Sequence, residues 1–435
     1  KDEYGGSPKK RARLLEEIIK KIRSKVGPSF PIIVRLDAIE FRINNGIIPS
    51  DFLITAKIAE EAGADALDVS AYGNSNIGIA FTEGPLVHKP GGFIDFAKLA
   101  KEFLNIPIIA VGRIELDVAE NNIKEGNFNF LALGRKLLAD PELPNKVMMI
   151  NKEMIRPCIY CYVCVSKIFI NKPMNCAVNS SLGNEVDDKN LLQKSINRLK
   201  ILVVGGGPAG MEVSRLLMHQ GHNVSIWEQD KDLGGSARMA GLAYKPNQDF
   251  IDYLRNSLEE LNVPIKLNKT ATIKEIQNNS PDLVIIATGA NRSSPEIIGK
   301  DLRHVFDGEQ LRKLLFSSES TILKKITFFQ SALVQIGRLT QLLRNITFLR
   351  FISKFWMPFG KNITIIGGDL VGLELAEFLS HRNRNITVLE PSRDLGSNLS
   401  IVRRARLIHE LKNMGVNLFT NIKIKEITKT KVNYS

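Results

Sequence analysis

Short apolar runs alternate with amphipathic stretches over the first 150 residues of the chain. The amphipathic stretches have helical periodicity and cover 11–27, 51–64, 93–105 and 118–127. The apolar runs are typical of buried strands and cover 30–36, 65–71, 106–112 and 130–134. Apolar strands that alternate with helices predict a parallel sheet built from four strand–helix units.

Glycine and arginine follow the last two of these strands, at Gly112-Arg113 and Gly134-Arg135. Glycine lets backbone N–H groups approach a phosphate, and arginine pairs with it through two parallel hydrogen bonds. In β/α barrels the active site gathers at the carboxyl ends of the strands, with a phosphate site after the last two. The two pairs therefore predict a phosphate-binding site. The alternative is that both arginines are ordinary surface residues.

A different pattern begins near residue 200, where an apolar strand runs into the sequence G-x-G-x-x-G. Its glycines are Gly205, Gly207 and Gly210, and an amphipathic helix and a second strand lead from them to Glu228. In a dinucleotide-binding unit these glycines allow the tight turn, the approach of the diphosphate and the packing of helix on strand. The helix N-terminus favours the diphosphate charge, and Glu228 is placed to accept hydrogen bonds from ribose hydroxyls. A later apolar strand ends at two residues that we assign to the same site, Thr288 and Gly289.

The pattern occurs again after residue 360, with Gly367, Gly372 and Glu390 in the corresponding places. The first glycine and the acid are 23 residues apart in both copies (205 to 228 and 367 to 390). This repeat predicts two nucleotide sites in tandem. Asp369 stands where the second glycine belongs, so its carboxylate is expected to weaken diphosphate binding. The alternative is a dinucleotide fold with little or no affinity for a cofactor.

Composition and charge narrow the classes of protein. The formal net charge is +13, but lysine and arginine are spread along the chain without a basic stripe of interleaved aromatic residues, so we predict no nucleic-acid partner. The sequence contains no run of 18 apolar residues, so it predicts no membrane span. The first residues lack the apolar core of a signal peptide, so a cytoplasmic, reducing location is expected. Residues 301–360 are expected to form a packed helical insertion, with a lipid-surface helix as the alternative.

All 4 cysteines of the chain lie within 19 positions, at Cys158, Cys161, Cys164 and Cys176. In a reducing compartment metal ligation is favoured over disulfides. Three thiolates at this spacing can face one inorganic core from a single loop, and a fourth completes the ligation of a [4Fe–4S] cluster. Zinc is the first alternative, but structural zinc sites usually add a second distant C-x2-C motif or histidines. Unligated thiols or disulfides are the remaining alternative.

The order of these motifs resembles the flavin oxidoreductases related to 2,4-dienoyl-CoA reductase, trimethylamine dehydrogenase and bacterial enoate reductases. Those enzymes join an FMN-bearing barrel of the old yellow enzyme type, a [4Fe–4S] segment, and FAD- and NAD(P)H-binding domains. The resemblance lies in the four cysteines and in 2–7, 30–36, 106–114, 131–147, 203–213 and 285–290. It implies an α/β chain with the C-terminal half of a β/α (TIM) barrel, a cysteine-rich segment and two Rossmann-like units. The expected domains are 1–150 (barrel half), 151–195 ([4Fe–4S] segment and linker), 196–300 (FAD), 301–360 (insertion) and 361–435 (NAD(P), incomplete).

The resemblance also implies roles for single residues. Arg35 would contact the pyrimidine edge of FMN, and the two glycine–arginine pairs would hold its phosphate. The four cysteines would ligate the cluster, the first glycine unit would bind FAD, and the second would bind NADH, with NADPH as the alternative. Tyr72 and His88 follow the second strand and are weak candidates for the proton donor, since either can be simple loop surface.

Two departures from the family pattern bear on what the chain does alone. In the family the stretch 2–7 follows the fourth barrel strand, and here the C-terminus stops inside the second dinucleotide unit. We therefore expect a fragment of a longer protein, without the histidine loop that grips the substrate carbonyl. A half barrel leaves sheet edges open, so the isolated chain is expected to bind FMN poorly and to be catalytically incomplete. The middle cysteine spacing is also one residue shorter than in the dienoyl reductases, which a loop can absorb.

The implied reaction passes electrons from NAD(P)H to FAD, through the [4Fe–4S] cluster to FMN, and on to an activated C=C bond. The implied substrates are small unsaturated acids, ketones or acyl-CoA thioesters, and a homo-oligomer is compatible with the resemblance. One alternative is an amine dehydrogenase that sends electrons outward to an electron-transfer partner. The other is an electron-transfer module without a substrate site.

Overall fold

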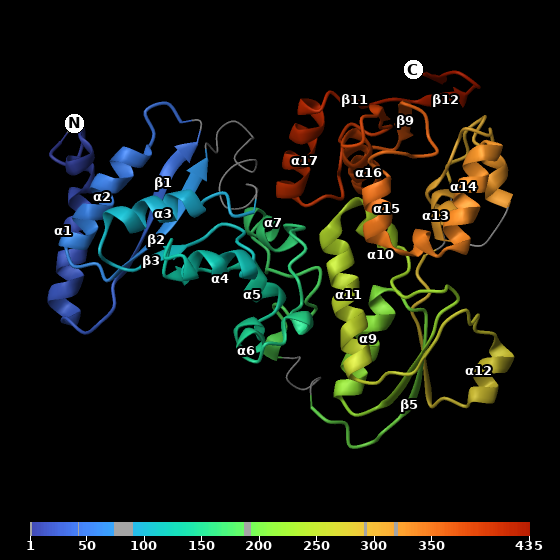
Figure 1. The fold of residues 1–435 in the computed structure, drawn as a ribbon, viewed down its shortest axis with the longest axis horizontal. Helices are drawn as coiled ribbons and strands as arrows, with labels where there is room; N and C mark the ends of the chain where they lie inside the picture. Colours follow the sequence, from blue (N-terminus) through green and yellow to red (C-terminus); the bar gives the residue numbers. More distant parts are fainter. Residues whose placement is uncertain (1, 42, 74–89, 187–192, 291–293, 317–320) are drawn as a thin grey trace. The chain divides into compact units, whose positions relative to one another are not determined.

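The computed structural model describes residues 2–41, 43–73, 90–186, 193–290, 294–316 and 321–435 (Figure 1). The chain divides into two compact units. We call Lys1–Gly134 with Ile401–His409 the barrel unit, and Arg135–Ser400 with Glu410–Ser435 the nucleotide unit. Among the described residues, no helix combines the length and the apolar character needed to cross a lipid bilayer.

The barrel unit is built on one parallel sheet in the order β1-β2-β3-β4. The strands are β1 (Ile33–Phe41), β2 (Ala66–Gly73), β3 (Ile108–Ala110) and β4 (Phe130–Leu131). The helices are α1 (Pro8–Val26), α2 (Pro49–Glu61), α3 (Ile94–Phe103) and α4 (Leu116–Lys124). Parallel neighbours need a crossover connection, which is usually a helix. The sheet confirms the four strand–helix units that the hydrophobic pattern predicts.

The two faces of this sheet differ in chemistry because successive side chains of a strand point to opposite faces. On one face Val34 of β1 and Leu67 of β2 are buried with Phe52 of α2 in the main apolar core. The other face of the same two strands carries polar side chains, namely Arg35, Asp37, Asp68 and Ser70. The helices therefore fix the sheet from one side, and the polar face is left for chemistry.

The nucleotide unit begins with the cysteine segment and continues into a Rossmann-like layer. The helices of the segment are α5 (Arg135–Ala139), α6 (Leu143–Met148), η3 (Lys152–Met154) and α7 (Val163–Phe169). The layer is a parallel sheet in the order β7-β6-β5-β8. Its strands are β5 (Lys200–Val204), β6 (Asn223–Trp227), β7 (Ile265–Lys266) and β8 (Leu283–Ile286). Its helices are α9 (Pro208–His219), α10 (Ala237–Ala243), α11 (Lys245–Glu260) and α12 (Ile273–Asn279).

A helical segment leads from this sheet to a second one. Its members are α13 (Gly308–Phe316), η4 (Thr321–Lys325), α14 (Phe328–Leu339), η5 (Leu342–Arg344) and α15 (Ile346–Ile352). Helix α14 begins with a capping box, in which Thr327 and Gln330 each bond the other's backbone N–H. The described part of 301–360 is therefore helical around its own small core, which includes Leu314, Ile322 and Val334.

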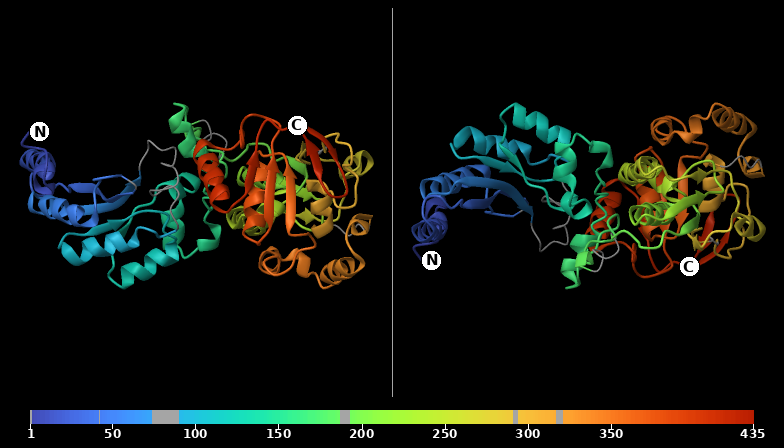
Figure 2. Two further views of the ribbon diagram at one scale, coloured as in Figure 1. Left: turned by 90° about the horizontal axis from the view of Figure 1, so that it is seen from above. Right: turned by 90° about the horizontal axis from the view of Figure 1, so that it is seen from below.

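The second Rossmann-like layer has a parallel sheet in the order β11-β10-β9, whose strands lie side by side, orange to red, in Figure 2. Its elements are β9 (Asn362–Ile366), α16 (Leu370–Ser380), β10 (Asn385–Leu389) and β11 (Asn417–Phe419). In the chain, α17 (Ile401–Asn413) connects β10 to β11, and its residues 401–409 are grouped with the barrel unit. A short antiparallel pair follows, β12 (Ile424–Ile427) and β13 (Val432–Tyr434). Each layer thus repeats strand, helix, strand, as the internal repeat predicts.

Candidate cofactor sites

The first glycine turn has the shape that a diphosphate requires. Gly205 lies at φ 110°, and a side chain there would collide with the carbonyl of Ala287 after β8. A side chain at Gly210 would collide with the carbonyl of Gly205, so α9 packs directly on the turn. At Gly207, by contrast, no described atom lies within 4 Å of the place a Cβ would occupy. Two glycines are thus needed for packing, and the third leaves room beside the helix N-terminus.

Glu228 closes the other side of this turn. The side chain is buried, with 6% of the residue exposed. Its Oε2 accepts a hydrogen bond from the N–H of Gly206 at 2.5 Å, and its Oε1 accepts one from the N–H of Asp230 at 2.8 Å. A carboxylate offers about four acceptor positions, so these two bonds orient Glu228 and leave capacity for ribose hydroxyls. Its predicted role in ribose binding stays a prediction.

Thr288 and Gly289 follow β8, which pairs with β5 in the sheet. Both residues are exposed, Gly289 lies at φ 76°, and no described atom lies within 4 Å of its would-be Cβ. Because β5 and β8 are parallel neighbours, their carboxyl ends meet at one edge of the sheet. The structure therefore brings these two residues to the same edge as the glycine turn.

The second glycine turn has the same backbone geometry. Gly367 lies at φ 103°, and a side chain at Gly372 would collide with the carbonyl of Gly367. The carboxylate of Glu390 accepts hydrogen bonds from the N–H groups of Gly368 at 2.6 Å and Ser392 at 2.8 Å. Burial raises the pKa of Glu390, but these backbone hydrogen bonds outweigh burial and lower the pKa below its usual value. Glu390 is therefore ionised at neutral pH.

The four cysteines are free thiols in partly buried surroundings. Burial raises the pKa of Cys161 to about 11 and also raises the pKa values of Cys158 and Cys164. The neighbouring thiols raise the pKa values of Cys158, Cys161 and Cys164 by smaller amounts. Across the described chain, no group of three or more His, Cys, Asp or Glu is placed to hold a metal ion. The [4Fe–4S] cluster therefore stays a prediction.

The backbone of the cysteine loop is shaped toward its sulfurs. Tyr160 and Tyr162 adopt left-handed conformations, at φ 50° and 61°. The N–H of Tyr160 donates to the sulfur of Cys158, and the N–H of Val163 donates to that of Cys161. Hydrogen bonds to cluster sulfurs are one of the means by which proteins set iron–sulfur potentials. Thiols with backbone N–H donors are the chemical types that hold an iron–sulfur cluster, so the donor set fits a cluster in kind.

Arg135 opens α5 and lies at this loop. Its guanidinium stands 4.9 Å from the ring centroid of Tyr162 and 5.4 Å from that of Tyr160. Burial raises the pKa values of Cys158 and Cys164, and the charge of Arg135 works in the opposite direction on both. Within the nucleotide unit Arg135 therefore contributes positive charge beside the thiols. Its assignment to the FMN phosphate stays a prediction.

A buried arginine that the sequence analysis did not single out holds the loop in place. Arg156 precedes the first cysteine by two residues and is only 8% exposed. Its N–H donates to Asp140 at 2.7 Å, and its guanidinium donates to Asn179 at 3.0 Å and to the hydroxyl of Tyr253 at 3.3 Å. Tyr253 belongs to α11, so Arg156 ties the cysteine segment to the first Rossmann layer.

The polar face of the barrel unit places beside Arg35 three polar residues that sequence reasoning missed, namely Asp37, Asp68 and Ser70. Arg35 donates to the carboxylate of Asp68 at 3.2 Å and to the hydroxyl of Ser70 at 3.3 Å. Burial raises the pKa values of Asp37 and Asp68, against the charge of Arg35 that lowers them. The available signal was the alternation of polar residues inside two strands otherwise rich in apolar ones. Arg35 thus stands among hydrogen-bonding groups on one face, as a residue that contacts a flavin edge requires.

The glycines of the predicted FMN phosphate site follow neighbouring strands. Gly112 comes after β3 at φ 112°, where a Cβ would lie 2.7 Å from the ring of Phe93, and Arg113 also adopts positive φ, at 53°. Gly134 follows β4, which pairs with β3, and has open space beside it among the described residues. The structure thus brings these two loops to one sheet edge. Their role stays a prediction.

Of the two candidate proton donors, only Tyr72 lies among the described residues. Tyr72 is the last residue but one of β2, is 47% exposed, and pairs in register with Glu40 of β1. His88 lies outside the described residues. The role of either residue as proton donor stays a prediction.

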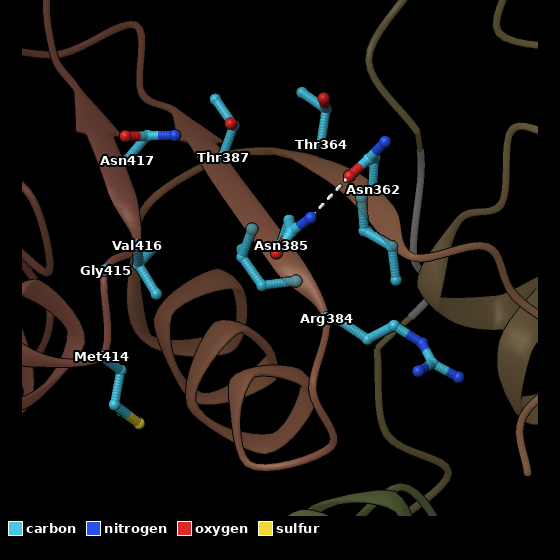
Figure 3. Close-up of a pocket in the computed structure, with 11 residues that line it drawn as sticks. Asn362, Thr364, Arg384, Asn385, Thr387, Met414, Gly415, Val416 and Asn417 are labelled. Carbon is cyan, nitrogen blue, oxygen red and sulfur yellow. Dashed lines mark hydrogen bonds between the residues drawn. The ribbon is translucent and has the colours of Figure 1, made fainter.

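A shallow cavity of about 350 Å³ lies at the other end of the second sheet (Figure 3). Its polar lining comes from the starts of β9, β10 and β11, namely Asn362, Thr364, Asn385, Thr387 and Asn417. The side-chain amide of Asn385 donates to that of Asn362 at 2.9 Å. Ligands of open parallel sheets bind outside the carboxyl ends of the strands, whereas this cavity is at the amino ends. It is therefore separate from the second glycine turn.

Two Rossmann-like units joined to a strand–helix sheet with an arginine-bearing polar face define a class, the flavin-dependent oxidoreductases that use nicotinamide nucleotides. Residues 1–152 match the NADH:flavin oxidoreductase / NADH oxidase family. Residues 203–250 match an NAD(P)-binding Rossmann-like domain, and residues 278–435 match the pyridine nucleotide-disulphide oxidoreductases. The NADH:flavin oxidoreductase / NADH oxidase match of residues 1–152 and the relatives below confirm the resemblance drawn from the motifs of the chain.

Individual relatives support the same assignment. The NADH oxidase of Thermoanaerobacter brockii is 31% identical over 98% of this chain and 60% of that protein. The cinnamate reductase of Clostridium sporogenes is 29% identical over 91% of this chain and 55% of that protein. The solved structure of 2-naphthoyl-CoA reductase with 2-naphthoyl-CoA matches with a TM-score of 0.84 at 27% identity, over 100% of this chain and 60% of that one. The chain therefore spans 55–60% of the length of these three relatives.

Proposed function

We propose that the chain serves an NAD(P)H-dependent oxidoreductase in which electrons pass from NAD(P)H to FAD, then through a [4Fe–4S] cluster to FMN, to reduce an activated C=C bond. The observation that carries the proposal is the pair of matching glycine turns in one unit with a thiol loop. When bound, nicotinamide supplies hydride, and the flavins and cluster convert between two-electron and one-electron transfer.

The residues of the chain have distinct tasks in this proposal. Gly207 leaves room for the FAD diphosphate, and Glu228 is oriented toward the ribose by the N–H of Gly206. Glu390 is the corresponding acid for the nicotinamide dinucleotide. Arg156 fixes the cysteine loop against α11, which keeps the thiols at a set position relative to the first turn. Arg35, which Asp68 and Ser70 hold by hydrogen bonds, would contact the pyrimidine edge of FMN.

The substrate class follows from chemistry and from the relatives. Cinnamate is an unsaturated acid, and 2-naphthoyl-CoA is an acyl-CoA thioester with an aromatic ring in conjugation. In both, a carbonyl group activates the ring or double bond toward hydride. We infer an enoate or acyl-CoA substrate for this chain, and its net charge of +13 suits an anionic one.

The test is anaerobic reduction of the whole protein that contains this chain, since the chain alone is expected to bind FMN poorly. FAD, FMN, iron and sulfide are supplied, NADH is added, and flavin bleaching is followed by absorbance. Cinnamate or an enoyl-CoA is then added, and reoxidation of the flavin together with the saturated product is measured. Bleaching by NADH followed by substrate-dependent reoxidation is expected. Bleaching by trimethylamine and not by NADH would contradict the proposal and establish the amine dehydrogenase instead.

A further inference from the structure

The loops that follow Glu228 and Glu390 return to their glycine turns in the same way. In the first unit the N–H of Gly234 donates to the carbonyl of Gly206 at 2.8 Å. In the second unit the N–H of Gly396 donates to the carbonyl of Gly368, also at 2.8 Å. The two loops are therefore in register. Gly207 and Asp369 are therefore equivalent positions in the two turns, and Ser236 and Asn398 are equivalent positions in the two loops.

The comparison shows a difference at one pair of positions. In the first unit the turn has Gly207, with open space beside it, and the loop residue that corresponds to Asn398 is Ser236. In the second unit the turn has Asp369, and the backbone N–H of Asn398 donates to its Oδ1 at 3.0 Å. The side-chain amide of Asn398 donates to its Oδ2 as well. Both carboxylate oxygens are thus held by one residue of the returning loop.

The direction of this contact matters for the helix behind it. Asp369 is the residue at the N-cap of α16, yet within the described chain its side chain makes no capping hydrogen bond to that helix. An aspartate at this position usually bonds the N–H groups of the first turn, the groups that bind a phosphate. Asn398 therefore draws the carboxylate to the loop side, away from the N–H groups that a diphosphate would use.

We propose that Asp369 and Asn398 act as a pair that sets the affinity of the second turn for dinucleotides. Asn398 holds the carboxylate to one side, so that the diphosphate can enter but binds weakly. Without the Asn398 side-chain amide, the backbone N–H of Asn398 still donates to the carboxylate, but the carboxylate can turn toward the N-terminus of α16 and oppose the diphosphate more directly. The inference rests on the proposed role of the second unit in binding NAD(P)H, and it makes that unit a site of lower affinity than the first.

The sign of each substitution follows from the charges. Asp369→Gly removes a negative charge beside the diphosphate and gives the second turn the glycine that the first turn has at Gly207. Two like charges a few ångströms apart repel by an energy that corresponds to about one to three decades in affinity, depending on the local dielectric. Asn398→Ala keeps the backbone N–H and removes one of the two bonds, so we expect it to weaken binding by about three- to tenfold. Opposite effects of Asp369→Gly and Asn398→Ala on dinucleotide affinity would distinguish this pair from two residues that only stabilise the fold.

The experiment measures dissociation constants by calorimetry for the wild-type chain, Asp369→Gly, Asp369→Asn, Asn398→Ala and the double variant Asp369→Gly/Asn398→Ala. The ligands are NADH, ADP-ribose and adenosine, of which adenosine lacks the diphosphate. We expect tighter NADH and ADP-ribose binding by both Asp369 variants, and no effect of Asn398→Ala once Asp369 is glycine. Adenosine binding should stay the same throughout. Glycine at an N-cap costs only a few tenths of a kcal/mol, so folding is preserved.

Three outcomes overturn the inference. Equal NADH affinity in all the variants would show that the pair has no part in binding, while the proposed NAD(P)H site stands. An Asn398→Ala effect that persists in the Asp369→Gly background would show that Asn398 acts through the fold. Absence of NADH binding in every variant, Asp369→Gly included, would remove the proposed NAD(P)H site together with the inference.

Discussion

Placing an aspartate at Gly207 would give the first glycine turn the residue that the second already has. The position is suited to the test because the would-be Cβ of Gly207 meets no described atom within 4 Å, so the substitution does not disturb the packing of the chain. The new carboxylate would lie where the turn leaves room beside the N-terminus of α9. An FAD diphosphate needs that same room, so the two compete by volume and by charge.

The magnitude follows from Coulomb's law. Two unit charges 4 Å apart repel by about 1 kcal/mol in bulk water and by about 4 kcal/mol near a protein surface. Since 1.4 kcal/mol is tenfold in affinity, Gly207→Asp should weaken FAD binding by about one to three decades from one charge alone.

The assay is the FAD content of the purified chain, together with a fluorescence titration of FAD and a thermal melt. Gly207→Ala is the matched control, since it adds a Cβ in the same open space without charge, and it should retain most of the FAD affinity. Gly210→Ala is the opposite control, because its Cβ would collide with the carbonyl of Gly205 and should lower the melting temperature as well. A Gly207→Asp chain with unchanged FAD affinity would refute the assignment of this turn.

Three further predictions test other parts of the molecule. Cys161→Ser should lower the iron and sulfide content of anaerobically prepared chain to near zero, and one equivalent of zinc without iron in the wild type would contradict the cluster. Burial raises the pKa of Asp68, so ionisation of Asp68 destabilises the folded chain as pH rises. Asp68→Asn should therefore melt at the same temperature as the wild type below about pH 3.9 and at a higher temperature above the folded pKa. A gain in melting temperature that shrinks with rising pH would contradict this sign. Glu390 should accept bonds from a ribose 2′-hydroxyl and repel a 2′-phosphate, so NADH should reduce the flavin faster than NADPH. Faster reduction by NADPH that is lost in Arg393→Ala would show that Arg393, three residues on and exposed, decides instead.

Much of the fold was predictable because its determinants are local. The alternation of apolar runs and amphipathic stretches predicts the parallel sheet, and the positive φ at Gly205 and the close packing at Gly210 are requirements that only glycine meets. The same holds for Gly367 and Gly372 in the second turn. A pattern of a few residues carries this information without reference to the rest of the chain.

The contacts that the sequence did not reveal join residues far apart in the chain. Asn398 is 29 positions from Asp369, and Asp68 is 33 positions from Arg35. Arg156 contacts Tyr253 across 97 positions. Each of these is a polar contact set by how loops and strands pack, and a single sequence contains no local signal for the partner. They position the candidate sites that the glycines and cysteines mark.

The central claim is that the first glycine turn delivers electrons to a cluster held by the cysteine loop. The most direct measurement is the electron paramagnetic resonance signal of the reduced cluster in the reconstituted chain after anaerobic addition of NADH. The account predicts a reduced-cluster signal in the wild type. In Gly207→Asp the signal should be absent with NADH and present with dithionite. A signal of equal size with NADH in both proteins, or none in the wild type with either reductant, would contradict the account.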